Sequence, residues 1–140
     1  MTDRDLAYYG LGIADLAASP AVVRELEARK ACEALALVAC GLRSLSGLPA
    51  LARLRTLDVS SNLIGPSLDG SLFPWALSLE ALEVLDVSKN ALETLDGRGR
   101  GWPRLSELRC ASNKLRTLEH LPALAPRLEA LDARDNAVSD

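Results

Sequence analysis

The amino-acid sequence predicts an α/β solenoid of about six stacked repeats. Two observations support this prediction: Leu accounts for 29 of the 140 residues, and one eleven-residue frame of apolar positions recurs along the chain. A repeat of this size cannot bury its leucine face alone, so neighbouring repeats must stack. We therefore expect residues 1–140 to form one domain, with a curved parallel β-sheet on the concave face and short helices or 3₁₀ turns on the convex face.

The clearest copy of the frame spans residues 82–92 and reads L-x-x-L-x-L-x-x-N-x-L, with Val87 at the third apolar position. Three further copies also have Asn at the ninth position, a fifth has Cys there, and a weaker sixth copy opens the chain with Leu. We call these ninth positions the Asn slots; they are Leu11, Cys40, Asn62, Asn90, Asn113 and Asn136. Their spacings of 29, 22, 28, 23 and 23 residues lie within the range of leucine-rich repeats.

Each frame predicts a short strand followed by an inward turn. The L-x-L alternation has a period of two, which places one face of the strand in the core. The buried turn contains backbone donors and acceptors that need partners. An Asn side chain offers an acceptor oxygen and two N–H donors, so a stack of Asn residues can satisfy successive turns. Cys40 offers only a weak S–H donor in the same place.

The convex side is expected to hold a helix over residues 20–31, with Ser19 as its N-cap and Pro20 as its first residue. The 22–23-residue repeats leave room only for 3₁₀ turns or short helices. Pro49 and Pro122 occupy equivalent places just before a helical turn. The leucines expected to line the inner wall of this side are Leu45, Leu48, Leu51, Leu118, Leu121 and Leu124.

Two turn-rich stretches, residues 65–71 and 96–103, interrupt the repeats without shifting their register. Trp75 and Trp102 fall on the convex side near these stretches. Stacked aromatic side chains there are expected to fill the core; the alternative is a binding hot spot.

Charge and composition exclude several classes of function. The net charge is −3 and neither half of the chain is basic, which argues against direct nucleic-acid binding. The longest apolar run, residues 34–42, is too short to span a membrane. Three cysteines do not make a disulfide scaffold, and residues 2–5 do not resemble the basic start of a secretory signal. We therefore expect a reduced, intracellular protein, cytoplasmic or nuclear, with no membrane partner.

No catalytic constellation can be assembled from these residues. His120 is the sole histidine, and no Ser or Cys has a base near it in the sequence that would activate it. A single His without a close Cys pair argues against a zinc site. Gly97, Gly99 and Gly101 are not followed by the Gly-Lys-Ser/Thr of a phosphate loop. We expect no enzymatic activity, no cofactor, no metal and no small-molecule substrate.

The frame resembles the short, strand-plus-turn leucine-rich repeats of intracellular proteins. That group includes phosphatase-1 regulatory subunits, an axonemal dynein light chain and the U2 snRNP A-prime protein. Residues 41–51, running into residues 54–62, most resemble the repeat domain of the acidic leucine-rich nuclear phosphoproteins. Those proteins also carry a helix between their first two repeats and a longer, Gly-bearing repeat after the second Asn.

This chain departs from that family at its end, because it lacks the aromatic capping segment after the last repeat and the acidic tail. A terminal repeat needs a cap for solubility. We therefore expect either truncation or a partner at the last repeat.

An apolar patch is expected on the concave face, where Ala34, Ala36, Val38 and Ala39 lie beside Tyr9. Exposed apolar patches often mark interaction sites. The alternatives are that Ala is merely common in this chain, or that N-terminal residues cover the patch.

A second candidate lies farther along the concave face, where Asp58 and Asp86 are neighbours in one column with Ser60 and Ser88 beside them. Two carboxylates about one strand spacing apart repel each other, and a basic partner would relieve that repulsion. The alternative is a solvated face with local ion pairing by arginines. Together the two patches predict these partner-binding residues: Tyr9, Ala36, Val38, Asp58, Ser60, Asp86, Ser88, Arg109, Asp132 and Arg134.

The sequence therefore predicts a non-enzymatic protein-interaction module that binds a protein partner, with a basic one favoured, on its concave face. The resemblance implies a nuclear or cytoplasmic regulator. The alternative is a structural subunit of a larger assembly, of the snRNP or axonemal dynein type, docked through its C-terminal edge or its convex face.

Overall fold

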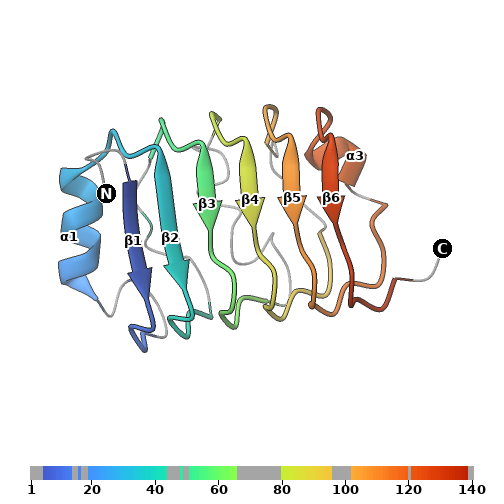
Figure 1. The fold of residues 1–140 in the computed structure, drawn as a ribbon, viewed down its shortest axis with the longest axis horizontal. Coiled ribbons are helices and arrows are strands. Elements are labelled where there is room, and N and C mark those ends of the chain that lie inside the picture. The colour runs from blue at the N-terminus through green and yellow to red at the C-terminus, as the bar shows by residue number, and fades with distance from the viewer. Residues whose placement is uncertain are drawn as a thin grey trace.

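The computed structural model describes residues 5–13, 16, 19–43, 48, 51–65, 80–95, 102–119 and 121–138. In this part of the chain six strands form one parallel sheet, and each strand pairs with the next one along the sequence (Figure 1). One strand per repeat and one uniform pairing order make the fold a parallel repeat solenoid. The described elements are β1 (Asp5–Tyr9), α1 (Pro20–Ala28), β2 (Ala34–Val38), β3 (Thr56–Asp58), β4 (Val84–Asp86), β5 (Glu107–Arg109), α3 (Leu121–Leu124) and β6 (Ala130–Asp132).

The strand register agrees with the alignment of the repeats. The weak first copy joins the sheet without a gap, because Tyr8 of β1 pairs with Leu37 of β2. The apolar positions of the frame meet in one core on the inner side of the sheet. One row of that core consists of directly paired strand leucines: Leu6, Leu35, Leu57, Leu85 and Leu108. Leu131 continues the row on β6 but is 43% exposed.

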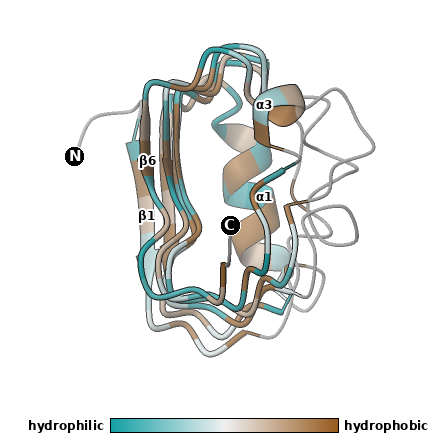
Figure 2. Ribbon diagram, turned by 90° about the vertical axis from the view of Figure 1, so that its right-hand side faces the viewer, coloured by the Kyte–Doolittle hydropathy of each residue, from teal (hydrophilic) through white to brown (hydrophobic). Residues whose placement is uncertain are grey.

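Both described helices lie on the same side of the sheet, and no described helix or strand covers the other side (Figure 2). Helix α1 buries Leu26, and Val22 and Val23 pack partly against the core. From β1, the Tyr8 hydroxyl donates a hydrogen bond to the Glu25 carboxylate of α1. The uncovered side, called the open sheet face below, is the face that the sequence analysis expects to be concave.

Helix α1 begins where predicted but ends earlier. Ser19 is the N-cap and Pro20 the first helical residue, although the Ser19 hydroxyl makes no capping hydrogen bond. The predicted span of residues 20–31 is three residues too long, because the helix ends at Ala28. Residues 29–31 turn instead, which brings Cys32 to its fully buried core position.

The leucines expected to line the convex wall are buried or partly buried wherever the structure describes them. Leu48 and Leu51 are buried, as are the two terminal leucines of α3, while Leu118 is partly buried. Helix α3 is short, as a 23-residue repeat requires, and Pro122 is its second residue rather than its predecessor. Trp102 is 1% exposed, so it packs in the core. Four of the predicted convex features, Leu45, Pro49, Trp75 and residues 96–101, lie outside the described residues.

The inward turn after each strand depends on one left-handed residue directly before the Asn slot. All six of these residues have φ between 55° and 63°, although only the first is a glycine. A left-handed conformation disfavours most side chains, so the surrounding hydrogen bonds must hold it in place. The six residues are Gly10, Ala39, Ser61, Lys89, Ser112 and Asp135.

Four Asn side chains, those of Asn62, Asn90, Asn113 and Asn136, form a hydrogen-bonded ladder along the solenoid. Each side-chain oxygen accepts a hydrogen bond from the backbone N–H of the residue two positions after the preceding Asn slot, at 3.0–3.1 Å. Each side-chain amide donates to two carbonyl oxygens of its own turn and to one of the preceding repeat, at 2.7–3.2 Å. The predicted stack of Asn residues is therefore confirmed.

Cys40 takes the same place in the second repeat with weaker bonds. Its Sγ lies 3.7 Å from the Tyr8 oxygen and 3.4 Å from the Val38 oxygen, the carbonyls that an Asn would contact there. It has no side-chain acceptor for Ile13, whose N–H bonds instead to the backbone oxygen of Cys40. At the first slot Leu11 is 43% exposed. The ladder therefore weakens toward the N-terminal end.

The three cysteines are free thiols that are all buried in the core. Burial, together with the charges of Asp132 and Asp86, raises the pKa of the Cys110 thiol to about 12. Burial also raises the pKa of the Cys32 thiol. Because the thiolate is the reactive form, a raised pKa lowers the reactivity of Cys32 and Cys110, which pack in the core.

Replacing Asn62 by Ala tests the ladder. Asn62 is 4% exposed, so the substitution leaves several buried backbone groups of two turns without partners. We expect the free energy of unfolding, measured by urea denaturation, to fall by about 3 kcal/mol. The control is Asn136→Ala at the half-buried last slot, where water can replace the lost bonds and a loss of roughly 1 kcal/mol is expected. Equal losses of unfolding free energy in the two variants would contradict the conclusion that burial makes the Asn62 hydrogen bonds stronger contributors than those of Asn136.

Thiol titration with a disulfide reagent at pH 8 tests the cysteine environments. A pKa above its usual range leaves Cys110 protonated at this pH, and burial blocks access to all three thiols. We expect the native protein to react slowly and the urea-unfolded protein to release three equivalents at once. Rapid reaction of any one thiol in the native protein would be inconsistent with this packing.

Candidate functional site

The outward side chains of the strands stack in columns across the open sheet face. Tyr9 and Val38 pair at the end of β1 and β2. Ser60, Ser88 and Arg134 follow the later strands and accept backbone hydrogen bonds from the neighbouring repeats. The central column holds, in the predicted order, Ala7, Ala36, Asp58, Asp86, Arg109 and Asp132.

The structure places Asp58 and Asp86 directly opposite each other on β3 and β4. Both are half-buried, and each Oδ1 accepts a 2.9 Å hydrogen bond from the backbone N–H two residues later, that of Ser60 or Ser88. Within the described part of the chain neither carboxylate has a Lys or Arg within ion-pairing distance. Two like charges about one strand spacing apart, roughly 4.8 Å, are mutually destabilising. The pair therefore favours an approaching cation.

The carboxylate at the far end of the same column has its own cation. Arg134 donates to both oxygens of Asp132 at 2.9 Å, and its backbone N–H adds a third bond. These hydrogen bonds from Arg134 hold the pKa of the Asp132 carboxyl below its usual range. Local pairing, the alternative considered from the sequence, therefore holds at Asp132.

Arg109 also pairs locally, but with a residue that the sequence analysis left out of the site. Its guanidinium lies 2.5 Å from the carboxylate of Glu107, two residues earlier on the same outward face of β5. The period of two along a strand is the signal that could have identified this pair. Arg109 therefore does not neutralise Asp86, its direct neighbour across the strands.

The predicted apolar patch lies at the other end of the face. Ala34, Ala36 and Val38 are half-buried, whereas Tyr9 is 66% exposed. Residues 1–4, which the alternative would place over the patch, lie outside the described residues. Small side chains leave a shallow hollow of about 180 Å³, lined by Asp5, Leu6, Ala7, Ala34, Leu35, Ala36, Thr56 and Asp58.

The structure joins the two predicted patches into one surface, because Asp58 belongs to both the hollow and the acidic pair. Of the eight lining residues, only Ala36 and Asp58 were among the predicted partner-binding residues. Ala34 was expected in the apolar patch and Leu6 and Leu35 in the core, whereas Asp5, Ala7 and Thr56 were not singled out. Their small or short side chains carry no sequence signal of their own, and only the register brings them together. The open sheet face thus offers an apolar recess with uncompensated negative charge at its rim.

Among the described residues, no group of three or more His, Cys, Asp or Glu side chains is arranged to hold a metal ion. His120 lies outside that part of the chain. None of the described helices has the length and apolar character needed to cross a membrane.

Two known proteins resemble parts of the chain, while no protein-family model matches it. It is 40% identical over 82 residues to geranylgeranyl transferase type-2 subunit alpha of Sus scrofa, a match that covers 57% of this chain and 13% of that protein. It is 35% identical over 105 residues to Toll-like receptor 2 of Mus musculus, covering 64% of this chain and 13% of the receptor. The chain therefore spans about an eighth of the length of the curated relatives that it matches.

Proposed function

We propose that this chain is a non-enzymatic protein-interaction module that binds a basic segment of a partner protein on its open sheet face. The observation that carries the proposal is the pair of adjacent, uncompensated carboxylates of Asp58 and Asp86 beside the alanine hollow. A Lys or Arg of the partner would relieve their repulsion, and a neighbouring apolar side chain would fill the hollow.

The partial match to Toll-like receptor 2, a protein named as a receptor, supports a role as a protein-interaction module. The match covers only 13% of the length of that receptor. The recurring frame further supports the short leucine-rich-repeat class, and the resemblance to acidic leucine-rich nuclear phosphoproteins suggests a nuclear or cytoplasmic regulator. These finer assignments are part of the proposal.

The double variant Asp58→Arg/Asp86→Arg tests the binding face. Wild-type and variant chains would be used for affinity purification from the native cell, with partners identified by mass spectrometry. We expect a basic partner to be lost from the double variant, and its purified segment to bind the variant at least about tenfold more weakly. The interaction should also weaken with rising salt.

The matched control is Glu27→Arg/Glu93→Arg, which makes the same change in net charge at two exposed positions away from the strands. Circular dichroism of both double variants establishes that the fold is retained. The same partner list from all three proteins would refute the acidic pair as the binding site.

A structural subunit docked through its C-terminal end is the second candidate. Leu131 of β6 is 43% exposed, whereas the equivalent Leu57, Leu85 and Leu108 are at most 1% exposed. Beside this end an apolar hollow of about 330 Å³ is lined by Leu118, Leu121, Pro122, Ala125, Pro126 and Leu128. Exposed apolar surface of this kind is typical of an interface.

Analytical ultracentrifugation of the purified chain tests this second candidate. An exposed leucine edge should cause concentration-dependent self-association, and Leu131→Lys should shift the protein toward monomer. The exposed Leu63→Lys substitution is the control, because Leu63 is 55% exposed but lies at a repeat in the middle of the solenoid. A wild-type chain that is monomeric at all concentrations would count against docking through this end.

A further inference from the structure

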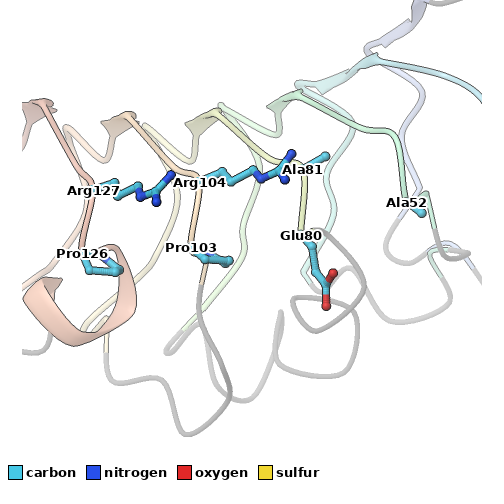
Figure 3. Close-up of a pocket in the computed structure, with 7 residues that line it drawn as sticks. All are labelled: Ala52, Glu80, Ala81, Pro103, Arg104, Pro126 and Arg127. Carbon is cyan, nitrogen blue, oxygen red and sulfur yellow. The ribbon is translucent and has the colours of Figure 1, made fainter.

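A groove of about 570 Å³ runs across consecutive repeats, close to where the strands begin (Figure 3). Two proline–arginine pairs, Pro103-Arg104 and Pro126-Arg127, form one part of it, and Ala52, Glu80 and Ala81 complete the lining. In each repeat these residues stand nine or ten positions before the Asn slot. The stacking of the repeats therefore places Arg104 and Arg127 about one strand spacing apart, roughly 5 Å between backbones.

The two arginines of the groove, Arg104 and Arg127, make no hydrogen bond or ion pair with another side chain in the described part of the chain. Arg104 interacts electrostatically with Glu83 without contacting it. A neighbouring arginine shows the contrast: Arg55 donates to Glu83 at 2.8 Å and lies 3.9 Å from Glu33. Glu83, the acidic side chain that Arg104 influences, is thus already bound by Arg55.

Figure 3 shows the two arginine side chains extended in one row, with the proline rings below them. The Glu80 carboxylate points away from that row. Two adjacent guanidinium groups repel each other unless an anion bridges them. The groove therefore combines an unsatisfied pair of cations with an apolar, rigid proline surface.

A phosphate group fits this arrangement better than a single carboxylate does. It carries a charge of about −1.5 to −2 and three acceptor oxygens, so it can accept bonds from two planar guanidinium forks at once. A carboxylate carries a charge of −1 and two oxygens, and the fork of one Arg already contacts both of them. The prolines lack backbone N–H groups and offer apolar contact to the residues that flank a modified side chain.

We propose that this groove binds a phosphorylated Ser or Thr side chain of a partner polypeptide, with Arg104 and Arg127 holding the phosphate. A long polyanion such as a nucleic acid fits less well, because the residues that line the groove include only these two cations and also the carboxylate of Glu80. The site is separate from the acidic pair of the open sheet face, so neither proposal depends on the other.

Titrations followed by ¹⁵N-resolved NMR test the groove with three probes. The first is an acetylated and amidated pentapeptide with a central phosphoserine, the second is its unphosphorylated form, and the third is inorganic phosphate. We expect saturable shifts around residues 103–104 and 126–127 with the phosphopeptide, none with the unphosphorylated peptide, and about tenfold weaker binding of inorganic phosphate. Equal affinity for the phosphopeptide and inorganic phosphate would overturn the proposal and leave an adventitious ion only.

The variant Arg104→Gln/Arg127→Gln should lower the affinity for the phosphopeptide by at least about tenfold. Arg104→Lys/Arg127→Lys keeps the charge but loses the planar forks, so an intermediate loss is expected. The control Arg24→Gln/Arg116→Gln makes the same charge change at two exposed positions outside the groove and should bind as the wild type does. Equal losses in this control and in the groove variant would refute a specific site. Binding to anionic lipid vesicles without binding to the phosphopeptide would refute the phosphopeptide proposal and indicate a lipid headgroup as the ligand.

Discussion

The Asn ladder is the interaction on which the rest of this structure depends. Each repeat turns its chain into the interior directly after a strand, and that turn holds a residue in the left-handed conformation. Buried backbone groups in such a turn would be costly without partners. In four of the six repeats one Asn side chain supplies both the acceptor and the donors that they need, and it does so for two adjacent turns at once. The leucine core gains its burial only because the turns can close in this way.

The same stacking also determines the surface. Residues at equal distances from the Asn slot come to lie side by side, whatever their chemistry. This places Asp58 next to Asp86 on the open sheet face and Arg104 next to Arg127 at the groove. A repeat protein thus concentrates like charges that would be far apart in an irregular fold, and each such row either finds local counterions or remains available to a partner. The row of Glu33, Arg55 and Glu83 has local counterions, because Arg55 lies between the two carboxylates.

Much of the fold could be predicted from the sequence because it depends on periodicity. The frame predicts the parallel sheet and the columns of the open sheet face, down to the gapless pairing of the weak first copy. It could not predict where helix α1 ends, since that depends on where the chain must turn to bury Cys32. Residue type and spacing are enough to predict the core leucines, but they do not predict the residue at which the helix ends and the turn begins.

The candidate site was predictable only in part, for a related reason. Column positions follow from counting residues, so Asp58 and Asp86 could be paired in advance. The partner of Arg109 depends on rotamers, and the structure selects Glu107 of its own strand. The hollow is a property of what Ala7, Ala34 and Ala36 leave unfilled, and an absence of side-chain volume has no signature in a single sequence.

The ladder also has a direction. Each Asn reaches back to the turn of the repeat before it, and Leu42, Ile64, Leu92 and Leu115 donate their N–H groups to an Asn that comes later in the chain. A repeat therefore cannot complete its own turn. When the chain leaves the ribosome, the turn of the latest repeat to emerge lacks its Asn acceptor until the following repeat has also emerged. The hydrogen bonds of the ladder can therefore form in the order of synthesis, with each turn completed one repeat later.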